Sequence, residues 1–408
     1  MFVEVESVER VILHCDCNNF FASVEASMNP ELNNYAFAVC GDPEYRHGII
    51  LAKNEKAKKY GVQTAEPIWQ AQRKCPDLLL VKPHYDKYKE YSKKIFEIYC
   101  RYTDLVEPFG MDECWLDVTG SQTLFGSGEK IANELRVLIK KEVGVTISVG
   151  VSYNKIFAKM GSDYKKPDAV TVITKENFKE LLYPLPAGEL FTVGRKAAAK
   201  LKSVGISTIG DIAGIGEGIL ENLLGVQGKV IFQYANGYDY SKVNHFQYRD
   251  AYKSIGNGMT FKTDLKTWAD VRTCVFFLSD KVSARLRKHD VECAGVQVGI
   301  RDTSMKTIMR SCSLDSPTDL AYDISEIAMN LIEENVNIEE NPIRALSITG
   351  IKLLDSYSVF NQASFFDIEI HQKHEKEGRL EEARDKIRKK YGLEKLKRCS
   401  LIENDFGI

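Results

Sequence analysis

The segment VILHCDCNNFFASVEASM, residues 11–28, changes character halfway along its length. Its first part, Val11 to Cys15, is a short apolar run typical of a buried β-strand, and its last part, Phe20 to Met28, predicts an α-helix. Asp16 stands at the end of the predicted strand, where a polar turn begins. A carboxylate is costly to bury unless it binds something, so Asp16 is either a turn or helix-capping residue or part of a binding site.

A second acidic group interrupts another hydrophobic segment, from Val106 to Val118. Asp112 and Glu113 lie there in a strand–turn–strand pattern, and an acidic pair of this kind is most simply a hairpin tip. Clustered carboxylates on a rigid sheet also suit Mg²⁺, which binds through a few carboxylates and substrate phosphates. Two such ions about 3.5–4 Å apart would stabilise both the attacking and the leaving oxygen of an in-line displacement. From these residues alone, both interpretations remain open.

The composition is that of an ordinary globular protein, with 408 residues, 44% of them hydrophobic and 27% charged. This length exceeds one hydrophobic core and predicts two to four domains. The net charge of −2 gives no hint of nucleic-acid binding, so any basic surface must be local. We expect no membrane span, since no apolar run approaches roughly 18–20 residues. The ten cysteines include no CxxC pair and the N-terminus does not resemble a signal peptide, so we expect a cytoplasmic protein with reduced thiols and no zinc site.

The chain changes its pattern several times. Up to Thr174 the predicted order of strands and helices suits an antiparallel-rich sheet backed by helices, which is an α+β domain. Residues 175–240 form short predicted helices separated by glycines, and residues 241–251 have no periodicity and are interpreted as a linker. Residues 252–354 return to mixed strand and helix, and the charged tail beyond them contains one predicted helix, roughly residues 375–391.

Three blocks of sequence resemble motifs of the Y family of lesion-bypass DNA polymerases, in its DinB-like branch. Residues 14–25 resemble the first polymerase motif, an aspartate followed by an aromatic pair, an alanine and a Val-Glu pair. Residues 110–118, GMDECWLDV, resemble the motif that carries Asp-Glu-Ala-Tyr-Leu-Asp. Residues 149–160 and the following Lys165-Lys166-Pro167 run resemble the next block. The blocks occur in the family's order, and the resemblance covers roughly residues 11–355.

The resemblance implies a fold that is α+β and multidomain, a right-hand polymerase with palm, small fingers, helical thumb with helix–hairpin–helix elements, and α+β little finger. The implied boundaries are a palm of residues 1–19 and 84–174, fingers of residues 20–83, a thumb of residues 175–240, a linker of residues 241–251, a little finger of residues 252–355 and a tail of residues 356–408.

The function that the resemblance implies is low-fidelity, template-directed DNA synthesis in translesion synthesis and DNA repair. Primer–template DNA and dNTP would be the substrates, and we expect a monomer. One alternative is a non-catalytic, clamp-bound adaptor of a mutagenic repair complex, which would lack the metal carboxylates. A second alternative is another palm enzyme such as a nucleotide cyclase, which the predicted helical thumb disfavours.

Residue by residue, the resemblance implies two Mg²⁺ ions bridged by Asp16 and Asp112, with Glu113 on the ion nearer the primer 3′-OH and the Cys17 carbonyl on the other. Nucleotide contacts are implied for Phe20, Phe21, Lys58 and Lys166. Phe21 aligns with the family's steric gate, an aromatic ring that leaves no space for a 2′-OH. Without the motif, Phe21 would be interpreted as a core residue of a helix.

Two positions in the expected nucleotide pocket depart from the family's pattern. Lys58 stands where arginine is usual, and a lysine lacks the bidentate fork of arginine. Glu55 stands where the family usually has a tyrosine that touches the triphosphate. An ionised glutamate repels phosphate, so either Glu55 points elsewhere and Lys53 or Lys56 substitutes for the tyrosine, or nucleotide affinity is reduced.

The resemblance also implies contacts to DNA and to a sliding clamp. Helix–hairpin–helix elements hold phosphates on backbone amides at helix N-termini, although these segments could also be simple helix connections. The residues expected to contact DNA are Lys155, Gly194, Gly225, Gly228, Arg285, Arg287 and Arg301. The tail segment that contains Gln362, Phe365 and Phe366 resembles the peptide that binds the bacterial sliding clamp, the β subunit.

Overall fold

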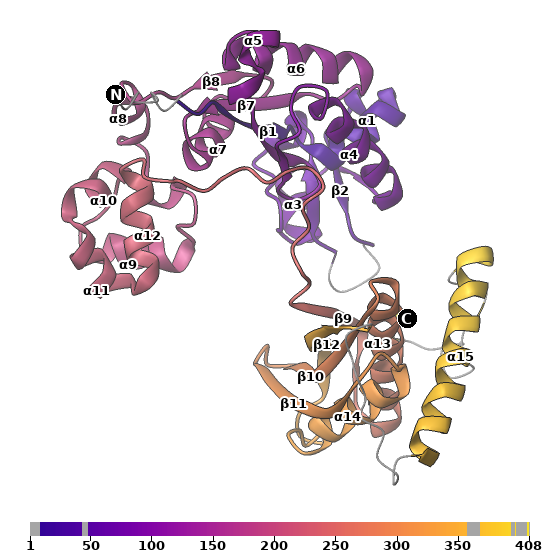
Figure 1. The fold of residues 1–408 in the computed structure, drawn as a ribbon. Coiled ribbons are helices and arrows are strands. Elements are labelled where there is room, and N and C mark those ends of the chain that lie inside the picture. Colours follow the sequence, from indigo (N-terminus) through magenta and orange to yellow (C-terminus); the bar gives the residue numbers. More distant parts are fainter. Residues whose placement is uncertain (1–8, 43–47, 357–367, 393–395, 397–405, 408) are drawn as a thin grey trace, which may run out of the picture. The chain divides into compact units, whose positions relative to one another are not determined.

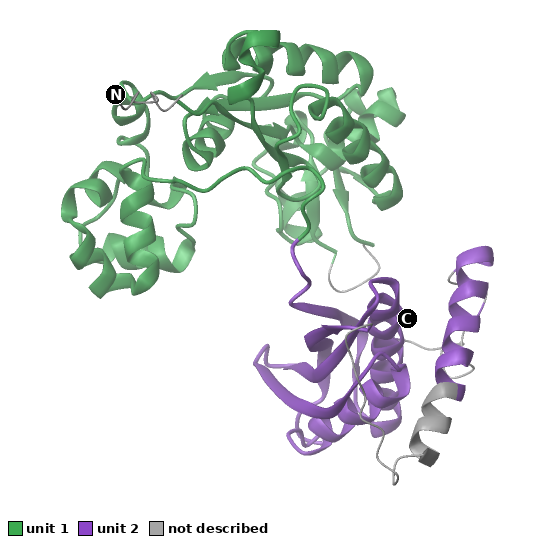
Figure 2. Cartoon of the chain, viewed as in Figure 1, with its two compact units in different colours: residues 1–43, 48–249 green, residues 44–47, 250–408 purple. Residues whose placement is uncertain are grey.

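A computed structural model describes most of the chain and divides it into two compact units (Figure 2). Unit 1 comprises residues 1–43 and 48–249, and unit 2 comprises residues 44–47 and 250–408. The described residues are 9–42, 48–356, 368–392, 396 and 406–407. None of the helices in these described parts is both long and apolar enough to cross a membrane.

The core of unit 1 is a five-stranded sheet with the order β5-β6-β1-β7-β8 (Figure 1). The central strand β1 (Ile12–Cys17) is buried along its whole length and pairs antiparallel with β6 (Glu113–Asp117) on one side and β7 (Ile147–Ser152) on the other. The edge strands are β5 (Val106–Pro108) and β8 (Val170–Val172). The mixed, mostly antiparallel sheet with helices confirms the predicted α+β fold class.

Alternation along β1 sends its side chains to two different helical layers. Leu13, Cys15 and Cys17 enter the core formed with helices α1 (Phe20–Met28), α4 (Tyr85–Tyr99) and α6 (Gly128–Glu142). Ile12 and His14 face helix α7 (Lys155–Tyr164) instead. At Gly150 on β7 a Cβ atom would collide with the backbone of α7 at Ala158, so this close approach requires glycine. By the same alternation, the Asp16 side chain lies on the face of the sheet that α7 covers.

Residues between α1 and α4 build a smaller sheet with the order β3-β2-β4 and its own apolar core (Figure 1). Its elements are the 3₁₀ helix η1 (Pro30–Asn34), strands β2 (Phe37–Cys40), β3 (Ile50–Lys53) and β4 (Leu79–Val81), and helices α2 (Glu55–Lys59) and α3 (Ile68–Lys74). Asn54 caps α2, since its side-chain oxygen accepts a hydrogen bond from the Ala57 amide at 2.9 Å.

The last part of unit 1, from residue 178 to residue 235, is helical, as its glycine-separated pattern predicts. Its helices are α8 (Phe178–Leu182), α9 (Arg195–Ser203), α10 (Ile209–Ile215), α11 (Glu217–Leu224) and α12 (Val226–Ala235). Gly228 lies inside α12, where a Cβ atom would collide with the carbonyl of Leu220 on α11. Gly228 therefore allows these two helices to pack closely.

The segment interpreted as a linker lies largely against the sheet of unit 1. Val243 is buried in one apolar cluster with Ile12 and Trp115. The amide of Asn244 donates to Glu107 Oε2 at 2.9 Å, and the amide of Phe246 donates to the Asp104 carbonyl at 2.9 Å. The structure thus places residues 241–249 within unit 1, and the division between the units falls after Arg249.

Unit 2 contains a four-stranded antiparallel sheet with the order β11-β10-β12-β9 and two helices on one face (Figure 1). The strands are β9 (Ser254–Leu265), β10 (Val291–Asp302), β11 (Thr307–Thr318) and β12 (Ile343–Asp355), and the helices are α13 (Trp268–Lys288) and α14 (Ala321–Glu333). A capping box of Thr267 and Asp270 begins α13.

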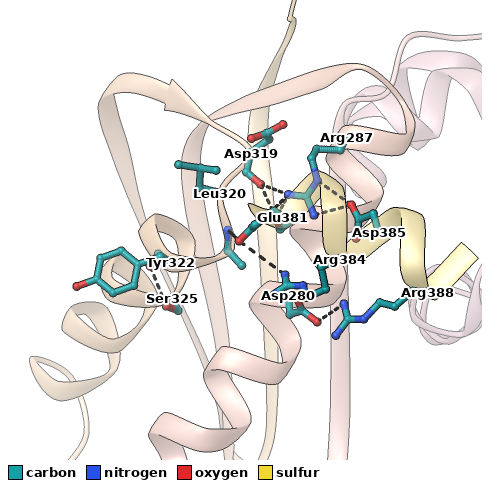
Figure 3. A network of polar contacts seen from close by, with 12 residues as sticks. Asp280, Arg287, Asp319, Leu320, Tyr322, Ser325, Glu381, Arg384, Asp385 and Arg388 are labelled. Atoms are coloured by element: carbon teal, nitrogen blue, oxygen red, sulfur yellow. Dashed lines mark hydrogen bonds and ion pairs between the residues drawn. The ribbon is translucent and has the colours of Figure 1, made fainter. Parts of the chain in front are cut away.

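The charged tail helix α15 (Ile368–Tyr391) contacts α13 mainly through ion pairs (Figure 3). Arg384 and Arg388 both bind the carboxylate of Asp280, whose side chain is only 8% exposed. Arg287 of α13 binds Glu381 and Asp385 of α15 in turn. The ion pairs between the two helices therefore involve three arginines and three carboxylates.

Replacing Asp280 by alanine should release α15 from α13. Two arginines would lose their buried counter-ion, and breaking a buried pair in this way costs about 3–5 kcal/mol. Hydrogen exchange of the α15 amides should accelerate accordingly, while exchange in α6 of unit 1 stays unchanged. Glu333→Ala is the matched control, because Glu333 pairs with Arg272 on the exposed surface and such pairs contribute under about 1 kcal/mol. If the α15 amides were equally protected from hydrogen exchange in both variants, the ion pairs would not be what holds α15 against α13.

Candidate active site

Three carboxylates meet at one end of the central sheet. Asp16 on β1 lies directly across from Glu113, the first residue of β6. Asp112 immediately precedes β6, and its carbonyl accepts a hydrogen bond from the Cys17 amide at 3.0 Å. All three line one pocket of about 450 Å³, together with Cys17 and Lys166. The structure therefore brings together the carboxylates that the sequence singled out, from positions about one hundred residues apart.

The turn after β1 is held by a buried asparagine that the sequence analysis did not single out. The Asn18 side chain donates to Ser148 Oγ at 2.9 Å, and its oxygen accepts from Thr146 Oγ1 at 3.1 Å and from the Asp168 amide at 2.9 Å. Asn19 then adopts a left-handed conformation with φ of 49° and begins α1. These bonds fix the loop between the carboxylate of Asp16 and the first turn of the helix.

Lysine side chains neutralise two of the three carboxylates. Lys166 Nζ lies 2.6 Å from Asp16 Oδ2 and 2.7 Å from Asp163 Oδ1. Burial raises the pKa of Asp16 to about 7, even though the ammonium of Lys166 favours the charged form. Burial and the neighbouring charge of Glu113 also raise the pKa of Asp112. The pocket thus concentrates negative charge that costs free energy when no cation is present.

Glu113 is held by two residues that the sequence analysis did not single out for this role. Lys159 Nζ binds Glu113 Oε2, and His14 Nε2 lies 3.2 Å from the same oxygen. Burial alone would raise the pKa of Glu113, but its contacts with His14 and Lys159 lower it to about 2. The alternation along β1 could have indicated His14, because it stands two residues before Asp16 on the same face.

The donor set fits a hard divalent cation, although the side chains are not arranged around one. Across the residues that the structure describes, no three His, Cys, Asp or Glu side chains form a cluster with the geometry of a metal site. Lysine ammonium groups bind Asp16 and Glu113 instead. Three carboxylates on a rigid sheet nevertheless offer the oxygen ligands that Mg²⁺ prefers. For such an ion to bind, the ammonium groups of Lys166 and Lys159 must move away from Asp16 and Glu113.

Aromatic rings form one wall of the pocket. Phe21 is half-buried, and its ring stacks on Tyr88 with centroids 4.1 Å apart and an interplanar angle of 12°. Phe20 also reaches the pocket but is only 4% exposed and belongs mainly to the core. The expected steric-gate residue thus borders the pocket, whereas its neighbour packs inward.

Glu55 faces the pocket and does not point elsewhere. Its Oε1 accepts a hydrogen bond from Asn19 Nδ2 at 2.8 Å and lies 3.7 Å from Lys58 Nζ. Lys53 lines the same pocket and donates to Thr64 Oγ1 at 3.0 Å. Lys56 instead donates to the Asn34 carbonyl at 3.0 Å and is not among the residues that line this pocket. Of the two expected substitutes for the tyrosine, only Lys53 is suitably placed.

Two of the basic residues expected to contact DNA are largely buried in ion pairs. Lys155 is 11% exposed, pairs with Glu107 at 2.6 Å and lies 4.4 Å from the centre of the Trp115 ring. Arg287 belongs to the ion network with α15. Both side chains are therefore committed within the protein, and a phosphate contact would require them to leave these partners.

Gly228, another expected DNA contact, is buried inside α12, and its amide donates to the Gly225 carbonyl at 2.8 Å, so it is already engaged within the protein. The other expected DNA contacts are more accessible. Gly194 and Gly225 are the N-terminal caps of α9 and α12, with open space around their Cα atoms. Arg285 and Arg301 lie on the exposed surface of unit 2. The clamp-peptide residues Gln362, Phe365 and Phe366 lie outside the described residues.

A pocket with three carboxylates at the end of an antiparallel sheet, an aromatic wall and several lysines is typical of a palm-type nucleotidyltransferase. Models of the impB/mucB/samB family match residues 15–163, and models of its C-terminal domain match residues 252–364. The chain belongs to the Y family of DNA polymerases, in the DNA polymerase IV branch.

Several relatives support this assignment. The chain is 45% identical to DNA polymerase IV of Acetivibrio thermocellus, over 97% of this chain and 98% of that relative. It is 35% identical to DNA polymerase IV of Bacillus velezensis, over 97% of this chain and 94% of that relative. A Y-family DNA polymerase chimera, Dbh-Dpo4(243-245)-Dbh, shares the fold with a TM-score of 0.76 at 21% identity, over 84% of this chain and 99% of that structure.

Proposed function

We propose that the chain is a template-directed DNA polymerase of low fidelity, which adds dNTPs to a primer 3′-OH in translesion synthesis and repair. The observation that carries this function is the meeting of Asp16, Asp112 and Glu113 in one pocket beside a lysine and an aromatic wall. The adaptor alternative is not favoured, because all three carboxylates are present. Nearly full-length similarity to DNA polymerases IV supports the same activity.

In this proposal, one group of site residues binds the cations and another group binds the nucleotide. Asp16 and Asp112 would hold two Mg²⁺ ions, with Glu113 on the ion nearer the 3′-OH and the Cys17 carbonyl on the other. When bound, such ions lower the pKa of the attacking hydroxyl and neutralise charge on the leaving pyrophosphate. Lys166, displaced from Asp16, remains beside the pocket as a point charge for the triphosphate, with Lys53 and Lys58 as further cations.

Removal of divalent cations should abolish primer extension. Asp16 and Glu113 would return to their lysine partners, and no group would remain to stabilise charge on the phosphates. The measurement is extension of an undamaged primer–template with dNTP and Mg²⁺, then with excess EDTA, then with Mg²⁺ restored. The melting temperature in EDTA controls for unfolding. Extension that persists in EDTA would contradict the proposed chemistry. A failure to extend the primer with any divalent cation would contradict it as well.

The partners follow from the same assignment. Primer–template DNA and dNTP are the substrates of such an enzyme, and binding of DNA would draw on Arg285, Arg301 and the helix N-termini at Gly194 and Gly225. Binding of a sliding clamp through Gln362, Phe365 and Phe366, a monomeric state and a cytoplasmic location are proposals that rest on the sequence resemblance.

A further inference from the structure

The orientation of the Phe21 ring depends on its contacts with two tyrosines. Tyr88 of α4 stacks beneath it, nearly parallel, and Tyr85 meets it edge to face with centroids 5.9 Å apart and an interplanar angle of 86°. Tyr88 is fully buried, so its ring forms a fixed surface against which Phe21 rests. Any freedom of the Tyr88 ring would therefore be passed on to Phe21.

The Tyr88 ring is in turn held by a carboxylate. Its hydroxyl donates to Oε1 of Glu25 at 2.5 Å. Glu25 stands four residues after Phe21 on α1, so both side chains project from the same face of that helix. Tyr88 thus contacts α1 twice, through its ring at Phe21 and through its hydroxyl at Glu25, and this closes a small loop of contacts between the two helices.

Glu25 is buried in a way that packing alone does not explain. Its side chain is only 5% exposed, and the described residues offer it Tyr88 and His84 as side-chain partners, with His84 Nδ1 at 2.9 Å from Oε1 and 3.1 Å from Oε2. A buried carboxylate costs free energy, and an apolar side chain would fill the same space at lower cost. A carboxylate supplies two contacts here that an apolar side chain cannot, one with His84 and one with the Tyr88 hydroxyl, and the second holds the ring against which Phe21 rests.

We propose that Glu25 is a positioning residue for sugar selection: it orients Tyr88, and Tyr88 holds the Phe21 ring at the place where it excludes a 2′-OH. This inference rests on the proposed polymerase function and on Phe21 as the gate. Glu25 and Tyr88 need no contact with the nucleotide, because they act through the ring. The group therefore adjusts selectivity for the sugar and leaves the metal carboxylates untouched.

The test compares kcat/KM for a dNTP and the matching rNTP, expressed as a ratio. This ratio does not depend on the fraction of enzyme that is correctly folded, so a merely destabilised variant keeps the wild-type value. Tyr88→Phe and Glu25→Leu each remove the hydroxyl–carboxylate bond and should lower the ratio by about three- to tenfold. Glu25→Gln keeps an acceptor oxygen of the same reach and should retain most of the wild-type ratio.

Tyr99→Phe is the matched control, because it removes a buried hydroxyl from the same helix outside the Phe21–Tyr88–Glu25 group. Its ratio should equal that of the wild type. Wild-type ratios in both Tyr88→Phe and Glu25→Leu, with normal dNTP insertion, would overturn the role of Glu25 and leave the polymerase function standing. A Glu25→Gln enzyme as unselective as Glu25→Leu would also overturn it. A wild-type chain that inserts no dNTP at all would instead overturn the proposed function.

Discussion

Replacing Asp112 by alanine should abolish primer extension, with kcat lowered at least about a thousandfold. A backbone hydrogen bond holds Asp112 at the pocket, because its carbonyl accepts a hydrogen bond from the amide of Cys17, the residue after Asp16. The substitution removes one carboxylate from the set that would hold both cations, while the sheet pairing of Asp16 and Glu113 remains. Loss of metal-assisted charge stabilisation is worth several kcal/mol in the transition state, and each 1.36 kcal/mol is about a tenfold change in rate.

Single-turnover extension of an undamaged primer–template at saturating dNTP measures this loss. Asp117→Asn is the matched control, because Asp117 ends the same strand and accepts a hydrogen bond from the Thr119 amide at 3.0 Å, away from the pocket. The control should extend the primer at nearly the wild-type rate. A rate for Asp112→Ala within tenfold of the control would mean that this carboxylate does not take part in the chemistry.

Replacing Phe21 by alanine should allow ribonucleotides into the pocket, with the preference for dNTP over rNTP lowered by about a hundredfold. The Phe21 ring borders the pocket and is backed by the buried Tyr88, so it cannot retreat from an added oxygen. Forcing extra atoms against a well-packed group costs about 1–3 kcal/mol, and alanine removes that obstacle.

The measured quantity is again the ratio of kcat/KM values for a dNTP and its rNTP. Phe37→Leu serves as the control, since this ring is fully buried in the same core and does not line the pocket. Its ratio should stay near the wild-type value even if the protein is less stable. An unchanged ratio in Phe21→Ala would show that another group excludes the 2′-OH.

The two lysine pairs suggest how the pocket tolerates its own negative charge between reactions. Lys166 and Lys159 neutralise Asp16 and Glu113 when no divalent cation is bound. Burial raises the pKa of Asp16, whereas the neighbouring carboxylates raise the pKa of Lys166 despite its burial, so the ammonium keeps its charge beside Asp16. A divalent cation, with twice the charge of an ammonium group, would displace both the lysine and any proton.

Local patterns predicted much of the secondary structure. The apolar run before Asp16 became the central strand, the periodic stretch of residues 85–102 corresponds to α4, and the glycine-separated segments became short helices. Motif order further indicated that Asp16, Asp112 and Glu113 would meet, and the strand register places Asp16 opposite Glu113. The segment without periodicity was harder to interpret, because its docking through Val243 and Asn244 depends on distant residues.

By itself, the sequence determined the strands, the helices and the identity of the acidic residues, because hydrophobic periodicity and short motifs are local properties of the chain. Only the tertiary structure decided which charges find which partners. Lys155 pairs with Glu107, Lys159 with Glu113, and Arg287 with residues of α15. Each of these pairs joins residues from separate elements, and an isolated lysine or arginine in a sequence carries no information about the carboxylate that will neutralise it after folding.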